Sequence, residues 1–252
     1  TVFHRERLLR ANVGWKWRYR VHEVVEPNPP STRGWQIRDD VRFIHKEHPR
    51  PESSAARNLR LLEIDLEELG ENDARTLFYL GNTYFALSDD LNAAYWYERL
   101  VATDSNVYQV WQGGVYLSMA YSRMGMWDDA ERAALKAIAT VPIHPQPYYQ
   151  LALVAKMRNR PEDCLYWTKE ARDKQPPPFF VFRNPLDDSF NNRVVLADAF
   201  RMMGRIPEAR AELEAAAAII PDQMVVDNLD NFKKLEAWAE IAGAYATLAN
   251  QL

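Results

Sequence analysis

The segment that decides the fold is LSMAYSRMGMWDDAERAALKAIATVP, from Leu117 to Pro142. Apolar residues recur in it at helical spacing, and Gly125 separates an earlier stretch from a later, alanine-rich one. Pro142 ends the second stretch, because proline cannot continue a helix. Since small residues let two helices approach closely, the segment predicts a closely packed pair of helices.

The same pattern recurs in three other windows of the chain. Counted between equivalent small residues, the steps are 37, 34 and 45 residues, and these residues are Ala93, Ala130, Cys164 and Ala209. A helix pair of this size cannot bury its apolar face alone, so neighbouring pairs are expected to stack and share a core. Because Cys164 stands where the other windows have alanine, we expect a buried packing thiol rather than a nucleophile or a ligand.

A period near 34 residues with small residues at helix contacts and proline after the second helix resembles the tetratricopeptide repeat. The resemblance covers residues 74–221 and implies a mainly α protein, a right-handed α-solenoid of about four tetratricopeptide-like helix pairs. An insertion, PPPFFVFRNPLDDS at 176–189, lengthens the third step, and its prolines prevent a continuing helix.

Two further helices are predicted to flank and cap the solenoid. SSAARNLRLLEIDLEELG, at 53–70, has apolar residues at helical spacing, with Ser53 or Ser54 as its N-cap and Gly70 at its end. The stretch 231–252 places apolar residues on one helical face, at Leu235, Trp238, Ile241, Ala242 and Tyr245.

The front of the chain has a different character, which is clearest in WKWRYRVHE at 15–23. Residues alternate with period two, which predicts a strand with Trp15, Trp17, Tyr19 and Val21 packed into a core. The other face would present Lys16, Arg18, Arg20 and His22. Such a row suits a diphosphate, because arginine and lysine donate charge-assisted hydrogen bonds to phosphate oxygens, but a half-exposed strand with solvated cations has the same pattern.

The charge distribution separates the same two parts. Of the ionisable residues, 1–60 hold 13 Lys/Arg against 7 Asp/Glu, and the remainder holds 18 against 28. The acidic body would repel a nucleic-acid backbone, so no nucleic-acid partner is expected. No run of about 18 apolar residues occurs, so no transmembrane segment is expected. A single cysteine fits a reducing compartment, which indicates the cytoplasm, and the absence of an initial Met suggests a piece of a longer chain.

The stretch FHRERLLRANVGWKWRYRVHEVVEP, at 3–27, resembles the end of the catalytic domain of bacterial family 2 glycosyltransferases. In that family an arginine-rich segment and an aromatic strand lead into a Val/Ile-His-Glu motif. Ile44-His45, the ARNLRLLE run at 56–63 and DARTLFYLGNTYFAL at 73–87 follow in the order of members with C-terminal tetratricopeptide repeats. The resemblance implies an incomplete GT-A domain, a short α/β remnant, at 1–50 and a tetratricopeptide-repeat domain at 51–252.

The activity that the resemblance implies is an inverting transfer from a nucleoside-diphosphate sugar to a protein or glycan acceptor. A divalent Mn or Mg would neutralise the diphosphate in the complete enzyme, and the repeat domain would need no cofactor. His22 and Glu23 would be catalytic: His22 would touch the metal or the diphosphate and Glu23 would position the acceptor or a cation-binding loop, or the roles would be exchanged. The residues implied for diphosphate binding are Lys16, Arg18, Arg20 and His45.

Two observations limit this glycosyltransferase interpretation. The family's Asp-x-Asp metal motif does not occur in the sequence, and neither do its first strand–helix units, so the chain by itself is expected to be inactive. The alternative is a stand-alone repeat scaffold for protein–protein interaction. The scaffold predicts a front segment packed on the first repeat, whereas the transferase predicts a frayed or partner-paired front strand.

Candidate partner-binding residues lie in three places. Trp35, in the proline-rich EPNPPSTRGWQ, is expected either to cover the acceptor site or to anchor its loop. Asn82 is the one residue that fits the clamp by which some tetratricopeptide grooves hold chaperone tails, so such a tail is not expected. The acidic, aromatic-rich array suggests a basic or apolar segment of a partner. An exposed apolar feature, or one that folds into the groove, is predicted at Phe179, Phe180 and Phe182.

Overall fold

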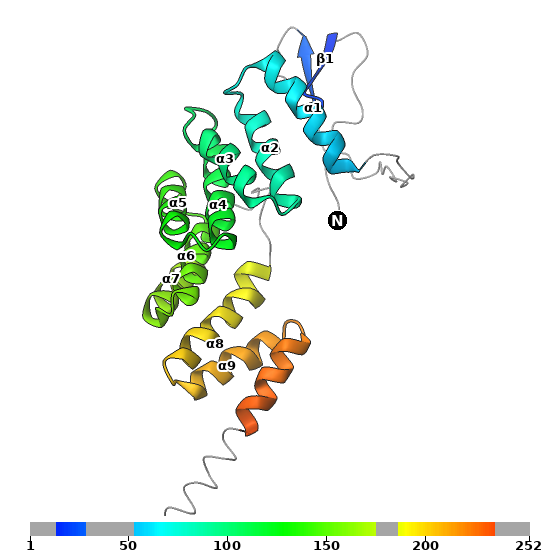
Figure 1. Cartoon of the computed structure of the whole chain (residues 1–252). Helices are drawn as coiled ribbons and strands as arrows, with labels where there is room; N and C mark the ends of the chain where they lie inside the picture. The colour runs from blue at the N-terminus through cyan, green and yellow to red at the C-terminus, as the bar shows by residue number, and fades with distance from the viewer. Residues whose placement is uncertain (1–13, 29–52, 175–185, 235–252) are drawn as a thin grey trace, which may run out of the picture.

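The computed structural model describes residues 14–28, 53–174 and 186–234, which form a curved array of helices preceded by a small hairpin (Figure 1). The hairpin pairs β1 (Gly14–Arg18) with β2 (Val24–Asn28) in antiparallel register, with Trp17 opposite Val25. The helices are α1 (Ser54–Leu69), α2 (Ala74–Ala86), α3 (Asp90–Val101), α4 (Val107–Arg123), α5 (Trp127–Thr140), α6 (Pro145–Met157), α7 (Pro161–Asp173), α8 (Asn192–Met202) and α9 (Ile206–Ala217). A π-helical turn at Asp187–Asn191 precedes α8, and residues 223–234 are helical.

The helices form two layers, as the predicted α-solenoid requires. Contacts connect α2 to α4, α4 to α6 and α6 to α8, and we call these four the inner helices. Each packs on the helix that follows it, and we call α3, α5 and α7 the outer helices. The outer helices lie on the convex side of the curve in Figure 1. The fold is therefore a solenoid of tetratricopeptide-like helix pairs.

Small residues permit the close approach within each pair. A Cβ atom on Gly81 would lie 2.4 Å from a ring carbon of Tyr97 on α3. At the equivalent position of the next pair, the Ser118 hydroxyl donates to the backbone oxygen of Ala130, at 2.8 Å. The four small residues that defined the repeat steps are fully buried, which confirms the predicted helix contacts at Ala93, Ala130, Cys164 and Ala209.

The predicted first flanking helix is confirmed at both ends. Ser53 is the N-cap of α1, and its side chain accepts a hydrogen bond from the backbone nitrogen of Ala56 at 3.2 Å. Gly70 ends the helix with a φ of 101°, a backbone conformation that favours glycine. The predicted C-terminal helix begins within the described residues, at 223–234, and its remaining predicted residues lie outside them.

The front segment departs from the prediction. The strand ends at Arg18, because Tyr19 and His22 have φ angles of 65° and 54° and turn the chain. Val21 consequently packs with Leu62 and Leu80, but Trp17 is 58% exposed. The expectation that one continuous strand face carries both tryptophans, Tyr19 and Val21 into a core is therefore wrong. Within the described ranges, no helix is both long and apolar enough to cross a membrane.

Cys164 should make stability sensitive to alkaline pH. Burial raises the pKa of its thiol from the ordinary value of 9.0 to about 11. The neutral thiol therefore stabilises the folded state relative to the unfolded chain. Because the pKa is higher in the folded state, this stabilisation is complete below pH 9.0 and is lost as the pH rises toward about 11. Between pH 8 and 10 we expect the free energy of unfolding of the native chain to fall by about 1 kcal/mol more than that of Cys164→Ala. Urea denaturation at both pH values measures this difference, and equal losses would contradict it.

Candidate functional site

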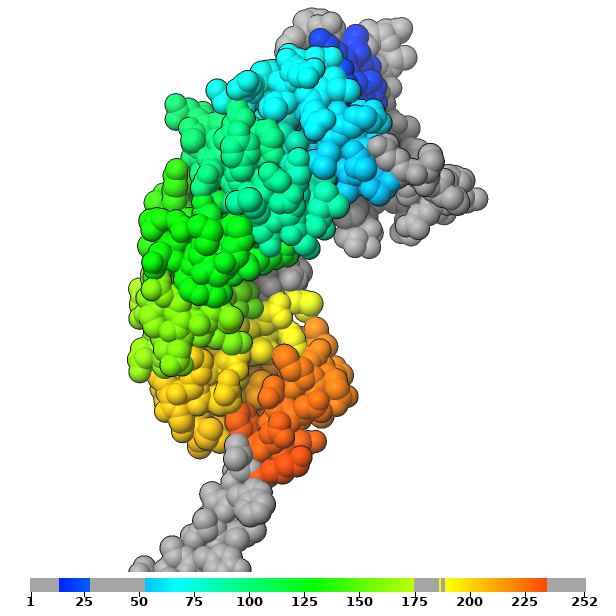
Figure 2. All heavy atoms as spheres, in the orientation of Figure 1, coloured from blue at the N-terminus to red at the C-terminus, as the bar shows by residue number. Residues whose placement is uncertain are grey.

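Each inner helix leaves one stripe of side chains partly exposed on the concave side of the array. In α2 this stripe contains Arg75, Tyr79 and Asn82, spaced by three or four residues, while Leu77 and Leu80 are buried in the core. The stripe continues on α4 and α6, at Tyr116, Met119, Tyr149 and Leu153. Figure 2 shows that the molecule is hollowed on this side, between the α1–α2 region and the helix at 223–234. We call this face the concave surface.

Aromatic rings form a connected strip across the first two inner helices. Phe78 contacts Tyr79 edge-to-face, with ring centroids 5.3 Å apart. Tyr116 on α4 lies 6.3 Å from Phe78 and 5.6 Å from Phe85. Phe78 is buried and the other three rings are partly exposed. One face of Tyr79 is covered by His22, one of Phe85 by Arg123 and one of Tyr116 by Tyr97. What this aromatic strip (Phe78, Tyr79, Phe85, Tyr116) offers an apolar or aromatic side chain is therefore the part of each ring that remains exposed.

Asn82 lies beside the aromatic strip and is oriented by Tyr97. The Tyr97 hydroxyl donates to Oδ1 of Asn82 at 2.7 Å, and the Tyr97 ring stacks on Tyr116 at 5.8 Å. Burial raises the pKa of Tyr97 well above its ordinary value, so the hydroxyl keeps its proton and remains a donor. The amide nitrogen of Asn82 is then the group that can donate to a backbone carbonyl of a bound segment.

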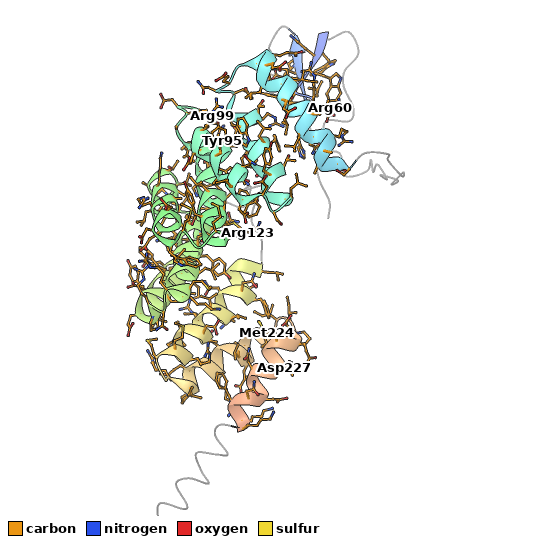
Figure 3. All side chains as sticks on the ribbon, viewed as in Figure 1. Arg60, Tyr95, Arg99, Arg123, Met224 and Asp227 are labelled. Carbon is orange, nitrogen blue, oxygen red and sulfur yellow. The ribbon has the colours of Figure 1, made fainter. Side chains whose placement is uncertain are left out.

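Cations lie around the aromatic strip. The Arg123 guanidinium is centred 3.7 Å from the Phe85 ring centroid, and one of its nitrogens lies 3.2 Å from Oδ1 of Asp90. Arg75 lies over Tyr79, with its guanidinium carbon 5.1 Å from the ring centroid. Away from the strip, Lys156 on α6 forms an ion pair with Asp198 that joins α6 to α8. Figure 3 labels Arg123, at the end of α4 on the concave side.

The hairpin packs on the first helices through the residues that follow β1. Arg20 donates from its backbone and its guanidinium to the Asp65 carboxylate, at 2.8 and 2.7 Å, and it also pairs with Glu68 at 2.7 Å. The Asp65 side chain is only 1% exposed. The His22 ring stacks on Tyr79, with centroids 4.4 Å apart. The front segment is thus packed on the array, as the scaffold interpretation predicts.

Arg20 should therefore hold the hairpin in place. Removing its side chain in Arg20→Ala leaves the buried Asp65 carboxylate without its cation, so the hairpin should detach more often. We expect faster hydrogen exchange of backbone amides in 14–28 than in the native chain, and unchanged exchange in α6 and α7. Lys16→Ala, on the exposed face of β1, is the matched control. Equal exchange in both variants would show that Arg20 does not dock the hairpin.

The described residues to which the glycosyltransferase resemblance assigned roles do not come together in one site. Lys16, Arg18 and Glu23 are exposed, and Arg18 lies 3.6 Å from Glu26, whereas Arg20 and His22 contact the first helices. In the part of the chain that is described, no group of three or more histidine, cysteine or acidic side chains could hold a metal ion. The other predicted residues lie outside the described residues: Trp35, His45, Phe179, Phe180 and Phe182.

Comparison with solved structures identifies the repeat fold. MamA from Desulfovibrio magneticus RS-1, residues 41 to the end, has a TM-score of 0.56 and 15% identity, with 68% of this chain and 88% of that chain covered. YrrB, described as a tetratricopeptide-repeat protein with an unusual peptide-binding site, has a TM-score of 0.54 and 14% identity over 70% and 84% of the two chains. TTC0263, a thermophilic protein of the same repeat class from Thermus thermophilus, has a TM-score of 0.51 and 22% identity over 69% and 88%.

These likenesses show a tetratricopeptide-repeat fold and do not extend to activity, because the identities are low. No family model matches the sequence, and no curated protein matches it either. The resemblance of the front segment to family 2 glycosyltransferases therefore has no support from a family model. The predicted roles of His22 and Glu23 stay predictions from the sequence.

Proposed function

We propose that this chain is a protein-interaction scaffold whose concave surface holds an extended segment of a partner protein. The observation that carries the proposal is the aromatic strip, which is partly exposed although aromatic side chains of this size usually gain stability from burial. Beside it, Asn82 can donate to the backbone of a bound segment. Apolar contact and a backbone hydrogen bond are the two elements that peptide recognition in a groove requires.

The neighbouring fold supports the same interpretation. YrrB is described as having a peptide-binding site, and its repeats superpose on most of this chain. In this chain the concave surface is built on inner helices that contact one another in succession, so its side chains are held by packed elements rather than by loops. A preformed surface reduces the ordering cost of binding.

We further propose that the hairpin belongs to this scaffold as its N-terminal cap. Arg20, Val21 and His22 bind it to α1 and α2, and its contacts cover the end of the array. Terminal repeats need such a cover, because the last helix pair would otherwise expose its apolar face. The described contacts thus favour the scaffold over a catalytic remnant, and the glycosyltransferase activity, with its sugar donor and Mn or Mg, is left as a prediction.

Site-specific photo-crosslinking tests the proposed surface. A photoreactive amino acid replaces Ala86 or Met157, which are exposed at the ends of the α2 and α6 stripes, and the matched controls replace Leu135 or Tyr166, exposed on outer helices. All four positions tolerate bulk because none is buried. We expect a partner protein to be crosslinked in cells at Ala86 and Met157 but not at the outer positions. Adducts confined to the outer positions would overturn the proposal.

A further inference from the structure

Charge is segregated between the two layers of the array. Three of the four inner helices, α2, α4 and α6, contain three cations and no acidic residue, and the cations are Arg75, Arg123 and Lys156. The fourth, α8, contains Asp198 together with Arg193 and Arg201. The outer helices α3, α5 and α7 contain nine acidic residues against five cations. The chain as a whole has a formal net charge of −4, so the positive charge of α2, α4 and α6 is opposite in sign to that of the whole protein.

Two of the three cations, Arg75 and Arg123, leave charge available to a ligand, whereas Lys156 is paired with Asp198 of α8. Within the described residues, Arg75 contacts the rings of Tyr19 and Tyr79 and donates to the backbone oxygen of His22, and none of these groups carries a negative charge. Arg123 pairs with Asp90, but the Arg123 side chain is 44% exposed. The Asp90 side chain is 16% exposed, so a ligand carboxylate would approach Arg123 from the exposed side of its guanidinium and share the cation with Asp90.

We propose that the occupant of the concave surface is an extended segment of another protein that carries acidic side chains next to an aromatic one. This inference rests on the proposed function and specifies its ligand. The aromatic side chain packs on the strip of Phe78, Tyr79, Phe85 and Tyr116, and carboxylates face Arg75 and Arg123 at its two ends. The expectation of a basic partner rests on the acidic charge summed over the whole array, whereas α2, α4 and α6 contribute none of its acidic residues.

Binding of three labelled peptides tests the inference. The peptides alternate tyrosine with glutamate, glutamine or lysine, so that they differ in charge and share their aromatic content. By fluorescence anisotropy at low salt we expect the glutamate peptide to bind about tenfold tighter than the lysine peptide, and this difference to shrink as salt rises. A lysine peptide that binds as tightly as the glutamate peptide would overturn the inference.

Three variants and a matched control locate the effect. Arg75→Gln and Arg123→Gln should each weaken the glutamate peptide about fivefold, by removing a cation beside the aromatic strip. Arg132→Gln removes the same charge from the outer helix α5, where the side chain is 69% exposed, and should leave binding unchanged. Asp90→Asn should strengthen binding about twofold, because it releases Arg123 from its acidic partner. Equal weakening in all three arginine variants would contradict a site on the inner helices.

The outcomes separate this inference from the proposed function. If crosslinks form at Ala86 and Met157 while the glutamate peptide does not bind, the surface binds a partner of other chemistry and the inference fails alone. If a lysine peptide binds and Tyr116→Ala weakens it, the inference again fails and the scaffold stands. If light scattering shows a second copy of the chain that the glutamate peptide cannot displace, the second copy is the occupant and the inference is wrong.

Discussion

Replacement of Tyr97 by alanine is expected to lower the free energy of unfolding by about 3–5 kcal/mol. Tyr97 on α3 is fully buried, stacks on Tyr116 and donates to Asn82. Its ring fills the space between the first outer helix and two inner helices, so alanine would leave a cavity and an unpaired amide oxygen. The first helix pair contacts both the hairpin and the second helix pair. The loss of stability should therefore also affect these two neighbours.

Urea denaturation followed by circular dichroism measures this loss. The matched control is Tyr95→Ala, two residues away on the same helix, where the side chain is 51% exposed. The control should cost about 1 kcal/mol or less, since it removes contacts that solvent already reaches. Similar losses in the two variants would contradict the assignment of Tyr97 to the core between the layers.

Replacement of Gly81 by valine is expected to cost about 3 kcal/mol. The first added atom would lie 2.4 Å from the Tyr97 ring, and an aromatic ring held between two helices cannot move aside. Gly113→Ala is the comparison: its new atom would lie 2.6 Å from Cδ2 and 3.1 Å from Cγ of the buried Leu100, an aliphatic side chain that can rotate where a ring cannot. This variant should cost less than Gly81→Val, because the gain in helix propensity, up to about 1 kcal/mol, partly offsets the local adjustment.

The double variant Gly81→Val with Tyr97→Ala makes the test sharper. Removal of the ring creates the space that valine needs, so the double variant should be about 1–3 kcal/mol more stable than the sum of the single losses predicts. Strictly additive losses would mean that Gly81 and Tyr97 do not compete for the same space.

The repeats could be predicted because their signal is periodic and redundant. Ala93, Ala130 and Ala209 recur in register, and each meets the same physical demand for close helix packing. Cys164 was correctly assigned to this class by its position alone. The ends of α1 were predictable for local reasons. Ser53 has the side-chain acceptor that favours a helix start, and Gly70 readily adopts the positive φ that favours a helix end.

The front segment was harder to predict because its structure depends on distant contacts. Alternation suggested a strand through Val21, yet the chain turns at Tyr19, and Arg20 instead meets Asp65 on α1. Tertiary contacts of this kind override a local period-two pattern. Nothing in the sequence around Arg20 predicts its contact with Asp65, which lies 45 residues later.

The candidate site was predicted only in part. The sequence predicts Asn82 from its place in the repeat, but the aromatic strip beside it forms only when α2 and α4 pack together and bring Tyr116 to Phe78. Arg75 and Arg123 were missed, because net charge was averaged over helices whose two layers differ. Counting charges separately for alternate predicted helices would have found the segregation, since inner and outer helices alternate along such a repeat.

The most direct test of the concave surface is hydrogen exchange, measured by mass spectrometry, with and without the partner captured by crosslinking at Ala86. The account predicts slower exchange in α2, α4 and α6 when the partner is bound, with little change in α3, α5 and α7. Slower exchange confined to the outer helices, or to the hairpin at 14–28, would contradict the claim that the concave surface is where this protein holds its partner.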